Sequence, residues 1–159
     1  MKMNEFSETE QKAIDEKLEQ LKQFKSGTLT PEQLAAIITT RRVDWIEANL
    51  EDMLKKYDGL NIEEAAYHII YFEHMRINPA DSKMTRVSST KIMVDSYNFC
   101  PYLEACKQLR LNTKFICKEV GEPSIQEMAR QIHPRIQFAR DYEIIRPDAQ
   151  FCREYFEFV

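Results

Sequence analysis

The sequence predicts an α+β fold, in which N-terminal helices precede a small antiparallel sheet with two or three short helices packed on it. Apolar residues follow helical spacing in residues 1–80, whereas alternation of apolar and polar residues appears only after residue 81. Each of the three glycines comes after a helical pattern. With 159 residues, we expect a single domain (1–159) with a helical half (1–80) and an α+β half (81–159) that carries the cysteines.

The helical half contains three expected helices. Two begin with capping boxes, at Ser7 and Thr30, each followed three residues later by Glu or Gln. The apolar stripe of the first helix is narrow, so this helix needs a partner, either in the same chain or in a second copy. Residues 39–42 interrupt the apolar face of the second helix, and we expect a kink or break there. The third helix is capped by Asn61 and ends near Pro79.

The second half contains the expected strands. Strand-forming residues predict two short strands between residues 84 and 94, and alternation predicts strands over 136–142 and 151–158. A short helix opens at Cys100-Pro101 and runs to Leu109, and a later one follows a capping box at 123–127 and ends at 133–134. Residues 113–117 fit either a strand or a turn into the next helix.

Composition limits the classes of function. Nine Phe, seven Tyr and one Trp favour a packed core, and no apolar run approaches the ~20 residues that span a bilayer. The first residues lack the apolar segment of a secretory signal, so we expect a cytoplasmic protein. Residues 83–146 hold 11 basic and 7 acidic side chains, within a net charge of −4. This local excess favours a small anionic ligand or substrate, and is too dilute for a nucleic-acid surface.

All four cysteines lie in the second half, at Cys100, Cys106, Cys117 and Cys152. Their spacing matches neither a zinc ribbon nor an iron–sulfur run. Cys106 falls on an apolar helix face and is expected to pack in the core. Cys100 precedes Pro101 and is expected at a helix N-terminus, where the helix dipole favours thiolate.

The three histidines are His68, His74 and His133. His68 and His74 are six residues apart on one helix, so they cannot chelate a metal together. His133 precedes Pro134 at the end of a helix. No Ser-His-Asp order, phosphate-binding loop or His-Glu-x-x-His pattern is present.

Several short motifs together resemble one family over about residues 84–158. They are Cys100-Pro101-Tyr102-Leu103-Glu104-Ala105-Cys106, Phe115-Ile116-Cys117, Ile132-His133-Pro134-Arg135-Ile136, and Asp148-Ala149-Gln150-Phe151-Cys152 followed by Phe156. In these elements the chain resembles the L-2-amino-thiazoline-4-carboxylic acid hydrolase family. Cys100, Cys117, Cys152 and Pro134 match the shared pattern. His133 stands where the family usually has Asn, and Arg146-Pro147-Asp148 replaces a glycine-containing turn.

The resemblance implies hydrolytic opening of a cyclic isothiourea to a carbamoyl-cysteine. In one hypothesis Cys100 is the nucleophile, His133 or His74 moves protons, and Arg135 or Arg140, with Cys152 nearby, holds the substrate. In a second, Cys100, Cys117 and Cys152 hold zinc or another thiophilic metal.

Three classes of function therefore stay open at this point. The first is a small hydrolase of the thiazoline type. The second is a non-catalytic module whose cysteines bind a metal or a small ligand, or sense redox state. The third is a plain interaction domain in which the cysteines are packing residues. A homo-oligomer formed through the first helix is compatible with each of the three.

Overall fold

A computed structural model describes residues 6–159, and its fold is α+β, as the sequence predicts. Its α-helices are α1 (Glu8–Lys25), α2 (Pro31–Lys56), α3 (Ile62–His68), α4 (Pro101–Leu109), α5 (Thr113–Ile116) and α6 (Glu122–Ile132). The strands are β1 (Ser82–Arg86), β2 (Lys91–Ser96), β3 (Ile136–Asp141) and β4 (Cys152–Phe158). Short π-helical or 3₁₀ segments η1 (Ile69–His74), η2 (Pro79–Asp81) and η3 (Cys117–Gly121) complete the described part.

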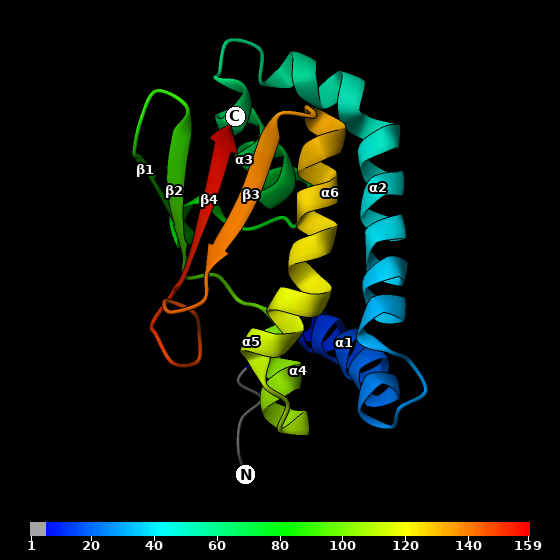
Figure 1. The fold of residues 1–159 in the computed structure, drawn as a ribbon. Helices are drawn as coiled ribbons and strands as arrows, with labels where there is room; N and C mark the ends of the chain where they lie inside the picture. The colour runs from blue at the N-terminus through cyan, green and yellow to red at the C-terminus, as the bar shows by residue number, and fades with distance from the viewer. Residues whose placement is uncertain (1–5) are drawn as a thin grey trace.

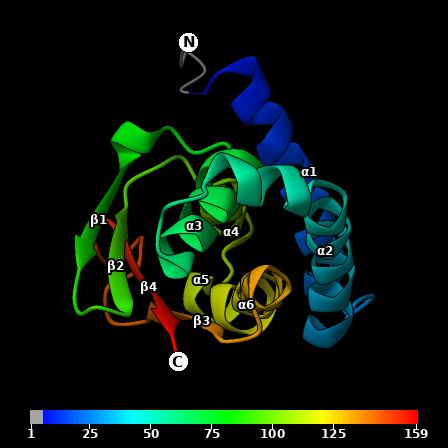
Figure 2. The same ribbon diagram turned by 90° about the horizontal axis from the view of Figure 1, so that it is seen from above.

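The four strands form one antiparallel sheet in the order β1-β2-β4-β3. Helices α3 and α6 pack against the sheet, and the long helix α2 lies along α6 on the side away from it. Helix α1 packs on α4 at the lower end of the molecule in Figure 1. Seen from above, α3 and α4 lie between the sheet and the α1–α2 pair (Figure 2).

Most expected boundaries agree with the structure. The capping boxes at Ser7 and Thr30 are both formed, and α4 begins directly after Cys100. Two expectations are wrong. Helix α2 runs without interruption through residues 39–42, because these residues keep helical hydrogen bonding and only change the polarity of one face. The capping box at 123–127 does not form, because α5, η3 and α6 are continuous and the Ser124 hydroxyl donates back to the carbonyl of Gly121.

The interior contains two apolar clusters. The larger lies between the sheet, α3, η1, α6 and the second half of α2, and includes Ile46, Phe138 and Phe156. The smaller lies between α1, α4, η3 and the first half of α2, and includes Leu21 and Ile38. The narrow stripe of α1 is therefore covered by this chain's own helices, and needs no second copy to be buried.

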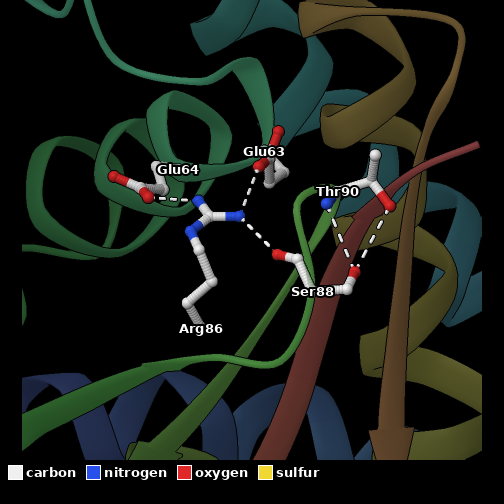
Figure 3. A network of polar contacts seen from close by, with 5 residues as sticks. All are labelled: Glu63, Glu64, Arg86, Ser88 and Thr90. Atoms are coloured by element: carbon white, nitrogen blue, oxygen red, sulfur yellow. Dashed lines mark hydrogen bonds and ion pairs between the residues drawn. The ribbon is translucent and has the colours of Figure 1, made fainter.

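The β1–β2 hairpin is tied to α3 by one arginine. Arg86, at the end of β1, pairs with Glu63 and Glu64 of α3, and its Nη1 also donates to the carbonyl of Ser88 at 2.9 Å (Figure 3). Glu63 is buried, so Arg86 provides the cation that its carboxylate requires.

Candidate functional site

The inward face of the sheet changes from apolar to polar along its length. Strand β4 points Cys152, Glu154 and Phe156 to the same side, because alternate residues share a face. Directly opposite Glu154 on β3 lies Arg140, and opposite Cys152 on β2 lies Ser96. Arg140 Nη2 is 3.4 Å from Glu154 Oε1, and the two side chains are only 10% and 6% exposed. A buried ion pair thus begins where the apolar face ends.

Arg42 of α2 belongs to the same neighbourhood. It lies one helical turn after Ile38 and one turn before Ile46, which belong to the two different apolar clusters. Its guanidinium therefore sits between the two cores. Burial lowers the pKa of Arg42, and the nearby charge of Arg140 lowers it further, whereas Tyr102 opposes the change. Arginine stays protonated under these conditions, so the interior holds a full positive charge here.

Lys17 and His74 extend this cationic group. Lys17 Nζ lies 4.7 Å from the centroid of the Tyr102 ring, and burial together with the charge of Arg42 lowers the pKa of Lys17 to about 8. His74 packs edge-on against Trp45, with ring centroids 4.8 Å apart. Burial, followed by the charges of Arg42 and Lys17, lowers the pKa of His74 to about 4. Near neutral pH the imidazole is therefore neutral while the lysine is charged.

Three of the four thiols adjoin these residues. Burial raises the pKa of Cys117 to about 11; Arg140 opposes the rise, and Cys100 and Cys152 add to it. The sulfur of Cys152 accepts from the backbone N–H of Arg146 at 3.5 Å and from its Nε at 3.3 Å. Cys100 is the N-cap residue of α4, as expected, but its side chain makes no capping hydrogen bond. Cys100 and Cys152 are thus close enough to Cys117 for their charges to act on it.

Cys106 differs from the other three. It is fully buried in the smaller cluster, and burial raises its pKa to about 12. A thiol in this environment stays protonated and packs as an apolar side chain, which agrees with the expectation for this position.

Several polar atoms of this neighbourhood have no hydrogen-bond partner among residues 6–159, although they are shielded from solvent. They are Arg42 Nη1, His74 Nδ1, Tyr102 OH, Arg140 Nε and Glu154 Oε2. Folded proteins satisfy nearly all such groups, since each orphan costs about 1–3 kcal/mol. All five belong to residues that are connected through Arg42 and Arg140, which makes this part of the interior the candidate polar site.

The structure separates two predicted residues from the thiols. His133 follows the last residue of α6, and Arg135 lies just before β3, whereas Cys117 and η3 lie at the opposite end of α6. The 11 residues of that helix measure roughly 16 Å. His133 accepts from the backbone of Arg135, which in turn lies over the ring of Phe158. These residues organise the far end of the sheet, while Arg140 and His74 belong to the thiol neighbourhood.

A metal held by Cys100, Cys117 and Cys152 needs these side chains to converge as a ligand set. Among residues 6–159, no group of three or more His, Cys, Asp or Glu side chains has that arrangement. All four cysteines, which fall within this range, are free thiols. The binding of zinc or another thiophilic metal by Cys100, Cys117 and Cys152 stays a prediction.

Sequence reasoning missed four residues of the site: Lys17, Arg42, Tyr102 and Glu154. Two of them left a visible signal. Arg42 interrupts an apolar helix face, and Glu154 stands between Cys152 and Phe156 on the apolar face of a strand. A charged residue on a face that is otherwise buried is costly, which makes it a candidate for function.

The comparisons with known proteins define the fold and leave the activity open. No protein-family model matches the chain, and no curated protein matches it. Among solved structures, the chain is similar to a trafficking protein particle complex subunit 3 from Naegleria fowleri, which was crystallised covalently bound to palmitic acid. That likeness has a TM-score of 0.56 and 12% identity, and covers 95% of each chain. At this identity the two proteins share a fold.

No helix in the described part of the chain combines the length and the apolar character needed to cross a membrane.

Proposed function

We propose that this protein binds a small carboxylate-bearing molecule at the Arg42–Arg140 neighbourhood and hydrolyses it, with a cyclic isothiourea of the 2-amino-thiazoline-4-carboxylate type as substrate. The observation that carries the proposal is the pair of solvent-shielded guanidinium groups with unpartnered N–H donors, Nη1 of Arg42 and Nε of Arg140, beside three thiols. Guanidinium donors match a carboxylate in both charge and geometry. The resemblance of the cysteine motifs supplies the reaction.

The residues divide into a binding part and a reacting part. Arg42 and Lys17 face the carboxylate, since both are cations without an acidic partner at ion-pair distance in the described residues. Cys100 lies at a helix N-terminus, a position typical of nucleophilic cysteines. His74, with a pKa of about 4, is a neutral and weakly basic imidazole near neutral pH, and its Nδ1 has no hydrogen-bond partner within residues 6–159, so its role here is to pass a proton between neighbouring groups and not to store one.

The covalent route balances with one water. The sulfur of Cys100 bonds to the amidine carbon, and the ring carbon–sulfur bond breaks, so that the ring sulfur leaves as a thiol with one proton. Water then adds to the same carbon, the bond to Cys100 breaks, and the carbonyl of a carbamoyl group forms. The enzyme thiol is regenerated, and the net change is the addition of one water to the ring.

A fatty acyl group is a less suitable occupant of this neighbourhood. The structural neighbour is covalently bound to palmitic acid, but the thiols here adjoin Arg42, Arg140 and Lys17. Burying a long alkyl chain beside unpaired cations gives up their solvation without replacing it. We therefore expect the purified protein to have its unmodified intact mass.

The proposal is tested by binding and turnover of 2-amino-thiazoline-4-carboxylate. Trp45 is the single tryptophan and packs on His74, so its fluorescence reports directly on the site. Arg42→Met is expected to weaken binding by about a hundredfold, because one partner of a buried charged contact is lost. Arg130→Met is the matched control, since Arg130 is an exposed arginine of helix α6 that pairs with Glu127 and acts on none of the groups of the site.

Cys100→Ser separates binding from chemistry. We expect it to bind the substrate as the unaltered protein does, and to lose at least about a hundredfold in turnover. Full turnover by this variant would remove the covalent route. Absence of any binding by the unaltered protein would overturn the proposed function. An intact mass increased by an acyl chain would instead favour acylation, as in the structural neighbour.

A further inference from the structure

The proposed anion site contains one acidic residue, Glu154, whose charge has the same sign as the expected ligand. Glu154 lies on the inward face of β4, 4% exposed, beside Arg140, one of the cations of the proposed anion site. Only one of its oxygens is used: Oε1 pairs with Arg140 Nη2 at 3.4 Å, while Oε2 has no partner within residues 6–159. Burial raises the pKa of Glu154 to about 8. The Arg140 guanidinium beside it favours the ionised carboxylate, and so would a bound amidinium group.

A purely structural role does not account for this arrangement. A carboxylate that served only to neutralise Arg140 would be expected to use both oxygens, since bidentate pairing is the stronger geometry. Here the pair is single, at 3.4 Å, and leaves Glu154 Oε2 and Arg140 Nε each unused. The pair therefore offers one acceptor and one donor to a third group.

We propose that Glu154 is the residue that recognises an N–H donor on the ligand, such as an amidine or amidinium group, while Arg42 and Lys17 hold its acidic end. This inference rests on the proposed function. It adds that the ligand must carry both an acidic group and an N–H donor. The ligand class is thus a small molecule that carries a carboxylate and, a few bonds away, a nitrogen base. A bound anion that lacks an N–H donor leaves Glu154 Oε2 without a hydrogen bond. The desolvation of this oxygen then weakens binding.

The recognition of both ends also explains the position of the two charges. Arg42 comes from a helix and Glu154 from the sheet, so a ligand between them contacts both layers of the fold. Arg140 touches Glu154, and its charge also acts on Arg42 and on Cys117. The proposed N–H contact at Glu154 thus lies next to Arg140, whose charge reaches Cys117.

The experiment compares two probes on three proteins. The probes are 2-amino-thiazoline-4-carboxylate and thiazole-4-carboxylate, which share the carboxylate and the ring size but differ in the amidine N–H groups. Their dissociation constants are measured by Trp45 fluorescence and by calorimetry. The unaltered protein is expected to prefer the first probe by at least about tenfold, the range of a hydrogen bond to a charged group.

Glu154→Gln is expected to bring the two dissociation constants to within about threefold of each other while thiazole-4-carboxylate binds as before. Glu157→Gln is the matched control, because Glu157 lies on the same strand but on the opposite face. If Glu154→Gln does not fold, Glu154→Asp keeps the charge but withdraws it by one methylene, and the preference should fall there as well.

The outcomes separate the two proposals. If the unaltered protein binds neither probe, the proposed function fails. If it binds both probes equally well, or if Glu154→Gln keeps the tenfold preference, the role of Glu154 is overturned while the anion site stands. A loss of affinity for both probes by the same factor would show that Glu154 acts only by positioning Arg140, which also contradicts the inference.

Discussion

Two groups of buried or half-buried charges in this protein are built in opposite ways. In the first, shown in Figure 3, Arg86 pairs with both Glu63 and Glu64 and donates to the carbonyl of Ser88. In the second, Arg42, Arg140 and Glu154 each keep a polar atom that has no hydrogen-bond partner within residues 6–159. The first group holds a hairpin on a helix, whereas the second is the group at which we propose that a ligand binds.

The difference teaches how to distinguish structural charges from functional ones. The two charges of a structural ion pair compensate the free-energy cost of each other's desolvation. Removing one of them leaves the other unpaired and destabilises the fold. A binding site keeps charges whose partners arrive only with the ligand, so that it costs stability in the free protein. Substitutions in the two groups should therefore change the free energy of unfolding with opposite sign.

The largest change in the free energy of unfolding is expected at the fully paired group of Arg86, Glu63 and Glu64. Arg86→Met should lower the free energy of unfolding by about 3 kcal/mol, because it leaves the buried carboxylate of Glu63 without its cation. Urea unfolding followed by circular dichroism measures this change. Adding Glu63→Gln to Arg86→Met removes the unpaired charge and should recover about half of the loss. A loss below about 0.5 kcal/mol would place Arg86 among ordinary surface ion pairs and weaken the comparison.

A smaller effect of opposite sign is expected at the unsatisfied group. Arg42→Met should leave the free energy of unfolding unchanged or raise it by about 1 kcal/mol, since a buried cation with an unpartnered N–H group is replaced by an apolar side chain of similar length. The measurement is urea unfolding of the ligand-free protein, beside the exposed control Arg130→Met. A loss above about 2 kcal/mol would show that Arg42 is a structural residue.

Local sequence rules predicted most of the fold. The capping boxes at Ser7 and Thr30 gave the starts of α1 and α2, because a helix start depends on residues within one turn. Alternation of apolar and polar residues predicted the bounds of β3 and β4 to within one residue. The break predicted in α2 was wrong because the pattern at Arg42 changes polarity, and polarity by itself does not break helical hydrogen bonds.

The site was predicted only in part, for a physical reason. Cys100, Cys117, Cys152, Arg140 and His74 were all named as candidates; the charges of Arg140, Cys100 and Cys152 act on Cys117, whereas His74 adjoins Arg42 and Lys17. Which side chains face them depends on how α1 and α2 pack on the second half, and this packing joins residues about a hundred positions apart. Periodicity within one element carries no such information, so His133 could not be distinguished from His74.

The smallest expected effect concerns pH and Lys17. Lys17 is faced by Arg42 of α2, by Arg41 on the same helix, by Glu16 on α1, and by Tyr102 and Cys100 at the start of α4. Its pKa of about 8 in the free protein rises when an anion binds, so binding takes up a proton. Affinity is therefore fully present below about pH 7 and falls as pH rises through 8.

Thiazole-4-carboxylate is the suitable probe, because its own charge is constant over this interval. We expect its affinity to fall by about threefold to fivefold between about pH 7 and about pH 9, since the guanidinium groups stay charged while Lys17 becomes neutral. Lys17→Met should bind with the lower affinity at both values. If the affinity of Lys17→Met decreases by the same factor over this interval, the titrating group is not Lys17. An affinity that rises with pH would contradict a cationic site. Deprotonation only removes positive charge, so it cannot strengthen the binding of an anion by such a site.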